Sequence, residues 1–266
     1  MNSKEIIKSK LKGDIVCNIK GYVNNITDNL IKGIETNIFE DDFQNGNGNE
    51  LKRKCLAVHS SSILCVNNFG VIKNNCSSFN FMFESKFNNA KFERKFYTGI
   101  SSPNLDFVLE NDNSIIAFES KFLEILNKKQ VKFADSYSKN KLIYLDDFWF
   151  KMIESYRNKN YYLDVAQLLK HTFGMIKYKT IHNKKNMILV YIYWMPKDYS
   201  KFPEYEKHKE ELELFNKKMS KQNNITFVSM TYSEYWDLVI KDNKNMKEHI
   251  CNVRSRYDIK IINNNF

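Results

Sequence analysis

Apolar residues in this chain gather into several short runs that are typical of strands. Ile115 to Phe118 is a continuous apolar run that ends abruptly at charged residues, and Met187 to Trp194 is a second run that stops before Pro196. Continuous runs of this length are typical of strands buried on both faces of a sheet. Residues 91–96 instead alternate well enough for a half-exposed strand that precedes the first run. The pattern therefore predicts a sheet whose central strands are buried.

Other segments repeat their apolar residues with a helical period. In residues 161–178 the apolar positions form one stripe, while Asp164, Gln167 and His171 fall on another face. Gly174 in the same segment would allow close approach to a neighbour. The predicted order is strand, strand, strand, helix, strand. Further helices are expected at residues 50–72, 144–156, 204–221, 233–240 and 245–257, and a further strand at 225–230.

Two of the predicted strands, 105–110 and 114–122, are joined by an Asn-Asp-Asn turn whose residue types tolerate turn conformations. If the loop consists of the last two of these three residues, the first asparagine faces Ser114. Counting back along both strands then puts Asp106 directly opposite Glu119. The segment is predicted to be a β-hairpin with a carboxylate on each strand.

The same hairpin brings a lysine to the two carboxylates. Side chains alternate along a strand, so Glu119 and Lys121 share one face while Ser120 points away. Two adjacent carboxylates, Asp106 and Glu119, repel each other and favour a bound Mg²⁺ or Mn²⁺. The lysine could hold an attacking water or stabilise charge on a phosphate. Glu93, on the preceding strand, is a further candidate metal ligand, and a solvated strand glutamate fits that position equally well.

These residues resemble a known signature. Pro103, Asp106, Glu119 and Lys121 are similar to the motif of the PD-(D/E)XK nuclease superfamily, although Pro103 stands three residues before Asp106 and not immediately before it. Gln167 to Gly174 resembles the helix that follows the E-x-K strand in an uncharacterised bacterial branch of these nucleases. The resemblance implies an α/β, restriction-endonuclease-like core with a mixed central sheet flanked by helices. An ordinary surface hairpin is the alternative.

The resemblance also implies a role for each residue of the site. Two carboxylates would hold the metal, a lysine would orient or activate water, and polar residues of the following helix would contact phosphate. The expected catalytic residues are Asp106, Glu119, Lys121, Gln167 and His171, the expected metal ligands are Asp106, Glu119 and Glu93, and Lys170 is expected to neutralise a phosphate.

Composition adds three points. The formal charge of +10 and the pI of about 9.1 favour a polyanionic partner such as DNA, although the lysine- and asparagine-rich composition of an A/T-rich genome contributes to this basicity. The five cysteines never form a C-x-x-C pair, so neither a disulfide framework nor a zinc site is suggested. The longest apolar run is too short for a membrane span, and no signal-peptide core is present, so a cytoplasmic protein is expected.

The expected domain organisation is an N-terminal extension of unknown function at residues 1–50, ending in a Gly/Asn-rich loop at 44–49, and a nuclease-like domain at 51–266. A helical insertion is expected at about 122–160. His59 is interpreted as a capping or surface histidine in preference to a site residue. The last helix, which carries Lys247, His249, Arg254 and Arg256, could touch a DNA backbone.

Together these features predict a metal-dependent endonuclease that hydrolyses DNA, with restriction or phage defence as the natural role. One alternative is a nucleic-acid-binding protein that keeps the fold without cutting. A second is a nuclease that acts on RNA, since the chemistry is shared. A homodimer would cut both strands and a monomer would nick, and the sequence does not choose between them.

Overall fold

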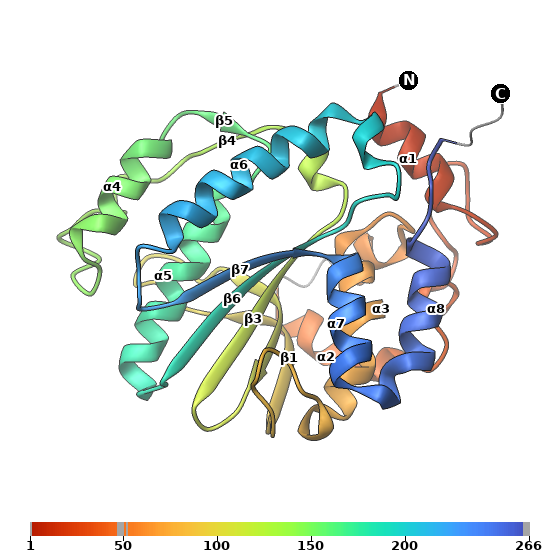
Figure 1. Cartoon of the computed structure of the whole chain (residues 1–266), viewed down its shortest axis with the longest axis horizontal. Helices are drawn as coiled ribbons and strands as arrows, with labels where there is room; N and C mark the ends of the chain where they lie inside the picture. Colours follow the sequence, from red (N-terminus) through yellow and green to blue (C-terminus); the bar gives the residue numbers. More distant parts are fainter. Residues whose placement is uncertain (1, 47–50, 52, 263–266) are drawn as a thin grey trace.

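The computed structural model describes residues 2–46, 51 and 53–262. They form an α/β fold in which a five-stranded mixed sheet lies between two layers of helices (Figure 1). The predicted fold class is confirmed. The strands follow the spatial order β1-β2-β3-β6-β7, with bounds β1 (Asn89–Lys95), β2 (Asn104–Glu110), β3 (Ser114–Lys121), β6 (Asn186–Tyr193) and β7 (Thr226–Thr231).

Apart from the helix predicted at 50–72, the predicted helices begin and end close to the positions that the apolar pattern indicates. Asp146, for example, caps the helix at 147–156 by accepting a 3.0 Å hydrogen bond from the Phe148 backbone N–H. No helix of the described residues is long and apolar enough to cross a membrane. The α-helices of this part of the chain are α1 (Ser3–Leu11), α2 (Glu40–Asn45), α3 (Ser61–Asn74), α4 (Asp147–Tyr156), α5 (Val165–His182), α6 (Pro203–Met219), α7 (Tyr232–Asp242) and α8 (Lys247–Tyr257).

The first three strands form an antiparallel meander with the predicted register. Phe107 pairs with Phe118 across β2 and β3, and the same count places Asn111 opposite Ser114. The Asn111 backbone N–H donates to the Ser114 carbonyl at 3.0 Å, which closes the two-residue loop. This register is the one that sets Asp106 against Glu119, so the predicted hairpin is confirmed.

Each face of the sheet has its own helical layer. Phe69 of α3 packs against Phe107 and Phe118, with ring centroids 4.7 Å away in both cases. Because side chains alternate along a strand, their neighbours Asp106 and Glu119 face the opposite layer, which contains α5 and α6. Figure 1 shows α3, α7 and α8 on one side of the sheet and α5 and α6 on the other. The polar residues of the hairpin therefore lie beneath α5.

The chain between β3 and β6 crosses over the sheet. β3 and β6 are parallel, and Glu119 pairs in register with Tyr191. The connection passes through the short 3₁₀ helix η5 (Glu124–Leu126), the strand pair β4 (Lys129–Gln130) and β5 (Asn160–Tyr161), α4 and then α5. The segment predicted as a helical insertion thus contains one α-helix, α4, together with η5, β4, β5 and irregular chain.

The N-terminal segment shares the core of the sheet domain. Ile7 and Phe39 have no exposed surface and belong to the same buried cluster as the central strands. Asp42 of α2 accepts a 2.8 Å hydrogen bond from the Phe92 backbone N–H, so α2 packs along the edge strand β1. Of the predicted Gly/Asn-rich loop at 44–49, residues 47–49 lie outside the described residues, and Gln44 and Asn45 belong to α2.

Two predictions about helices are wrong. The helix expected at 50–72 begins only at Ser61 and runs on to Asn74. It begins late because the preceding chain is tied to residues 21–22, by a bridge between Tyr22 and Ala57 and by a 2.9 Å hydrogen bond from the Val58 N–H to the Gly21 carbonyl. Inside the helix, Gly70 allows the close approach of Ile34.

The basic residues of α8 are also placed differently from the prediction. His249 is buried, Arg254 pairs with Asp237 of α7, and Arg256 donates to Asn29. Because His249 is buried and both arginines bind the protein itself, the structure does not favour α8 as a DNA-contacting helix.

Candidate active site

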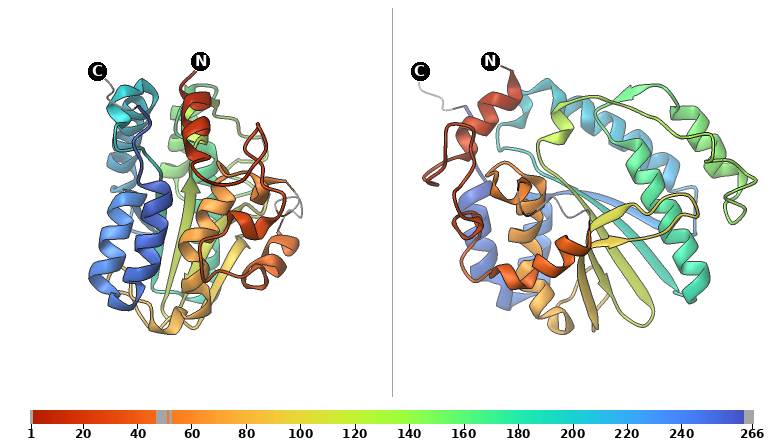
Figure 2. Two further views of the ribbon diagram at one scale, coloured as in Figure 1. Left: turned by 90° about the vertical axis from the view of Figure 1, so that its right-hand side faces the viewer. Right: turned by 180° about the vertical axis from the view of Figure 1, so that it is seen from behind.

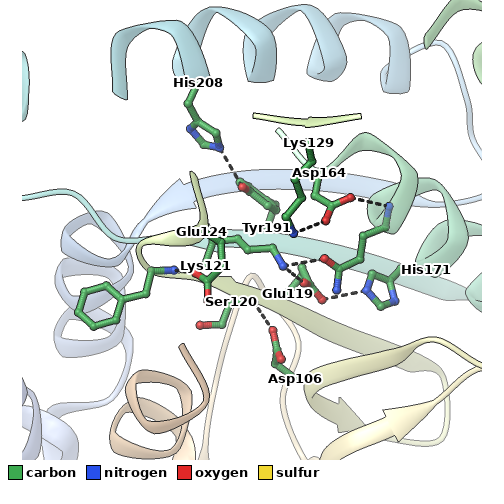
Figure 3. A network of polar contacts seen from close by, with 12 residues as sticks. Asp106, Glu119, Ser120, Lys121, Glu124, Lys129, Asp164, His171, Tyr191 and His208 are labelled. Carbon is green, nitrogen blue, oxygen red and sulfur yellow. Dashed lines mark hydrogen bonds and ion pairs between the residues drawn. The ribbon is translucent and has the colours of Figure 1, made fainter. Parts of the chain in front are cut away.

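The hairpin of β2 and β3 holds its polar residues at the end of the two strands. Asp106 is half-buried, and its Oδ2 accepts a 2.6 Å hydrogen bond from the Ser120 backbone N–H. Ser120 turns its hydroxyl to the other face, where it lies 2.7 Å from the Tyr232 hydroxyl. The prediction that Ser120 points away from Glu119 is therefore confirmed, and Asp106 is tied to the strand that carries Glu119 (Figure 3).

Glu119 and Lys121 form a buried ion pair on the face that α5 covers. Lys121 Nζ lies 2.5 Å from Glu119 Oε1 and donates at 2.7 Å to Gln167 Oε1. His171 Nε2 lies 2.9 Å from the other carboxylate oxygen of Glu119. Only 1% of Glu119 and 7% of Lys121 is exposed. Four of the predicted catalytic residues thus meet in one group, from β3 and one side of α5.

The start of α5 and its distance from the sheet place Gln167 and His171. Asp164 caps the helix by accepting a 3.1 Å hydrogen bond from the Gln167 backbone N–H, and it also receives Lys129 Nζ at 2.6 Å. Seven residues after Gln167, α5 passes very close to the end of β1. A Cβ on Gly174 would lie only 2.4 Å from the carbonyl oxygen of Phe96, the residue that follows this strand. The predicted close approach at Gly174 is confirmed, and it lets His171 reach Glu119.

The charges of this group are unevenly compensated. Burial opposes ionisation of Glu119, but the interactions of this carboxylate with Lys121 and His171 outweigh it and hold the pKa of Glu119 at about 2. Burial acts to lower the pKa of Lys121, but Glu119 and Asp106 outweigh it and keep this pKa above its usual value. Burial raises the pKa of Asp106 well above its usual range, and the charges of Glu119 and Glu93 raise it further. Asp106 is the carboxyl with too little positive charge around it.

Glu93 occupies an irregular position on β1. Its φ of +50° is rare for a residue other than glycine, and its Oε2 accepts a 2.9 Å hydrogen bond from the Asn104 side-chain amide. On either side of Glu93, Phe92 pairs with Phe107 and Arg94 pairs with Leu105, so the register of β1 and β2 sets Glu93 opposite Asp106. Glu93 is therefore next to Asp106 in the sheet, and its charge raises the pKa of that residue.

The carboxylates suit a magnesium ion, although they form no complete cage. Within the residues that the structure describes, no group of three or more His, Cys, Asp or Glu side chains is arranged to hold a metal ion. Mg²⁺ needs only about one or two carboxylates when waters and substrate phosphate oxygens complete its shell. Asp106 and Glu119 on paired strands, with Glu93 beside them, supply such hard oxygen donors. The pKa of Asp106 is raised first by burial and then by repulsion from Glu119 and Glu93, and a bound cation would offset that repulsion. The donor set therefore fits this ion.

Two other residues considered from the sequence lie outside the group. Lys170 Nζ lies over the rings of Phe133 and Tyr137, at 5.6 Å from each centroid, and does not join Glu119. His59 is partly buried beside Tyr22, at the end of the loop before α3. Neither residue contacts the hairpin carboxylates through an interaction that the structure shows.

The structure adds residues that the sequence reasoning did not select. Tyr191 on β6 is the in-register neighbour of Glu119, is fully buried, and places its hydroxyl 2.8 Å from His208 Nε2 of α6. Glu124 follows Lys121 by three residues and accepts a 2.8 Å hydrogen bond from the Phe122 backbone N–H. Its negative charge helps to raise the pKa of Lys121. The sequence could have drawn attention to Tyr191, because it places a hydroxyl inside the apolar run at 187–194. Only the register of β3 and β6 shows that Tyr191 lies next to Glu119.

Comparison with known proteins identifies a family. A family model described as REase-ARP, Restriction Endonuclease associating with ARP, matches residues 5–258. The match extends across the predicted domain boundary at residue 50. Neither a curated protein nor a solved structure matches the chain.

Proposed function

The chain belongs to the REase-ARP family of restriction endonucleases, and on that premise we propose that it is a metal-dependent endonuclease that hydrolyses DNA phosphodiester bonds, in restriction or phage defence. One observation carries the chemical part of the proposal. The two carboxylates Asp106 and Glu119 come from paired strands. Lys121 Nζ lies 2.5 Å from Glu119 Oε1 and donates at 2.7 Å to Gln167 Oε1. This arrangement in space supports the resemblance to the PD-(D/E)XK signature, which rests on the order of residues along the sequence.

Asp106 and Glu119 would hold the metal ion, with Glu93 as the third candidate ligand. When bound, Mg²⁺ or Mn²⁺ would polarise the scissile phosphate and lower the pKa of a water molecule. A bound cation would stabilise the ionised form of Asp106 in particular, because burial and two neighbouring carboxylates raise the pKa of this residue. Its 2.6 Å hydrogen bond from Ser120 fixes one oxygen and so orients the carboxylate.

Lys121 would act as a fixed cation beside the scissile phosphate. Its amino group is already engaged by Glu119 and Gln167, and its pKa stays above the usual value. It therefore stabilises negative charge that develops on phosphate and orients the attacking water, and it does not remove a proton. Gln167 would hold Lys121 in place, and His171 would hold Glu119 at 2.9 Å. The position of Lys170 over two aromatic rings gives its predicted phosphate contact no support.

The test is cleavage of supercoiled plasmid and linear duplex by the full chain in Mg²⁺, Mn²⁺ and EDTA. We expect metal-dependent nicking or linearisation, and a loss of about 100-fold or more in the Lys121→Ala variant, the usual scale for removing one group that stabilises transition-state charge. Lys244→Ala, which removes an exposed lysine from the turn between α7 and α8, is the matched control and should cleave normally.

Folding must be checked because Lys121→Ala leaves Glu119 buried without this partner. Circular dichroism and DNA binding in EDTA separate a misfolded variant from a folded, inactive one, and Asp106→Asn gives a second inactive variant with nearly unchanged volume. Cleavage retained in both folded variants would refute the assignment. Salt-sensitive binding without cleavage would favour the non-catalytic alternative, and preferential cleavage of structured RNA in competition with duplex would favour an RNA nuclease.

A further inference from the structure

Two neighbouring pockets lie between α1, the chain at residues 19–22 and the start of α3. One pocket has a volume of about 420 Å³ and the other about 610 Å³, and they share Lys20, Tyr22 and His59 as a common wall. Both volumes fall within the range of about 300–1,000 Å³ that ligand-binding pockets occupy. Together the two pockets form one depression, which we call the basic groove.

The lining of the basic groove is strongly positive. Of its two acidic residues, Glu5 is paired with Lys8 at 3.0 Å, and Glu124 accepts a backbone hydrogen bond from Phe122 at 2.8 Å. The excess of positive charge is characteristic of a surface that takes a polyanion. The basic residues that line the groove are Lys8, Lys12, Lys20, Arg53 and Lys54.

The lysines of the groove also act on His59, which lines both pockets. Burial is the main cause that lowers the pKa of His59 to about 4, and the positive charges of Lys8 and Lys4 lower it further, against the opposing charges of Glu5 and Glu124. Burial and the charge of Lys8 likewise lower the pKa of Lys4. A bound anion in the groove would offset the part of these shifts that comes from the neighbouring lysines.

The basic groove begins beside the candidate active site. Glu124 lines the larger pocket, and its charge acts on Lys121, which it follows by three positions in the sequence. Ser60 and Ser61, at the start of α3, line the same pocket. The right-hand view of Figure 2 shows α1 and the chain before α3 at the same end of the molecule as the segment that follows β3. A strand held at Lys121 could therefore continue directly into the groove.

We propose that the basic groove binds the sugar–phosphate backbone of the DNA next to the phosphodiester that the active site cuts. This inference rests on the proposed function. Continuity with a phosphodiester-cutting site favours DNA over an acidic peptide as the polyanion. Lys8, Lys20 and Arg53 neutralise backbone phosphates, which fixes the position of the duplex without reading its sequence. The N-terminal segment thereby becomes part of the substrate-binding surface.

The test compares two triple variants of the full chain. The groove variant carries Lys8→Gln, Lys20→Gln and Arg53→Gln, which removes charge from both pockets. The control variant carries Lys241→Gln, Lys244→Gln and Lys247→Gln, three exposed lysines around the turn between α7 and α8, and this turn lies at the opposite end of the molecule from α1 (Figure 1). A fluorescent duplex is titrated with each protein in EDTA over a series of salt concentrations, after thermal unfolding has shown that both variants are folded.

Each phosphate of duplex DNA that a protein neutralises adds about 0.9 to the steepness with which log affinity falls against log salt. We expect the groove variant to bind more weakly and its slope to be shallower by about 2–3, as this relation gives for three neutralising side chains, with the control unchanged. An unchanged slope in the groove variant, or an equal change in the control, would overturn the proposal. Cleavage by the wild type and the control in Mg²⁺ tests the proposed function separately, so a protein that binds through the groove but never cuts refutes only the nuclease.

Discussion

The substitution Gly174→Ala tests how α5 carries the active site. Gly174 lies seven residues after Gln167 and three after His171, so all three share the side of α5 that packs on the sheet. An alanine Cβ at this position would lie 2.4 Å from the Phe96 carbonyl oxygen and 2.8 Å from the Phe96 Cβ. Both are atoms of, or directly attached to, the backbone, so no change of rotamer relieves the overlap.

The expected cost follows from two opposing effects. Overpacking of a well-packed site costs about 1–3 kcal/mol, and replacing a mid-helix glycine by alanine returns about 0.8–1.0 kcal/mol of helix propensity. Because the overlap at Gly174 is with backbone atoms, we expect the upper part of the overpacking range, about 2–3 kcal/mol, which leaves a net loss in the free energy of unfolding of about 1–2 kcal/mol. In a chain of this size that corresponds to a fall of about 2–8 °C in the midpoint of thermal unfolding. The variant should also cleave less well, because α5 must move outward and carry Gln167 and His171 away from Lys121 and Glu119.

A second glycine supplies the matched control. Gly70 also lies inside a helix, but an alanine Cβ there would meet only side-chain atoms of Ile34, the nearest being its Cγ2 methyl at 3.1 Å, which has to move by only a few tenths of an ångström. Gly70→Ala should therefore be close to neutral in stability and should cleave normally. Thermal unfolding and plasmid cleavage are measured for both variants. A Gly174→Ala protein as stable and as active as the wild type would refute the argument that close packing of α5 positions the site.

Two further predictions concern residues near the site. Burial lowers the pKa of His208 to about 3, against about 6.5 in the unfolded chain, so the stability it contributes is present above pH 6.5 and is lost as the pH falls towards 3. Between pH 7 and pH 5 the wild type should lose about 2 kcal/mol more than His208→Gln in urea unfolding, since each pKa unit corresponds to about 1.4 kcal/mol; equal losses would contradict this. Asp164→Ala removes the cap of α5 and should cost about 1 kcal/mol in the same assay, whereas Asp164→Asn, which keeps a capping oxygen, should cost much less. Equal stability of the two Asp164 variants would show that the cap is unimportant.

Local patterns were sufficient to predict the five strands of the main sheet, most helices and the hairpin carboxylates, but not the short pair of β4 and β5. The register of β2 and β3 follows from a two-residue turn, because alternation along the strands leaves no freedom once that turn is fixed. The order of residues along the chain is therefore enough to place Asp106, Glu119 and Lys121 relative to one another. The helical spacing of Gln167 and His171 likewise showed that both residues leave α5 on one side.

Interactions between distant segments could not be predicted in the same way. The pairing of Glu119 with Tyr191 depends on the parallel register of β3 and β6, which no local pattern encodes. The ring contacts of Lys170 come from Phe133 and Tyr137, which lie in a loop with no clear periodicity. The start of α3 was misplaced because a bridge between Tyr22 and Ala57 holds the preceding chain extended. Each of these interactions involves a partner far away in the sequence.

The crossover between β3 and β6 also has a consequence for how the enzyme matures. Ser114 pairs with Asn186 across these strands, so the whole chain between them must be closed into a loop before the parallel ladder can form, whereas the hairpin that carries Asp106 and Glu119 closes through a two-residue turn. Non-local pairings of this kind form slowly, and local ones form fast. A chain that emerges from the ribosome therefore exposes its carboxylates early but receives Gln167 and His171 only when the crossover has docked. On the proposed function, the chain would become able to cut DNA only when β3 and β6 pair, which is the slow long-range step of folding.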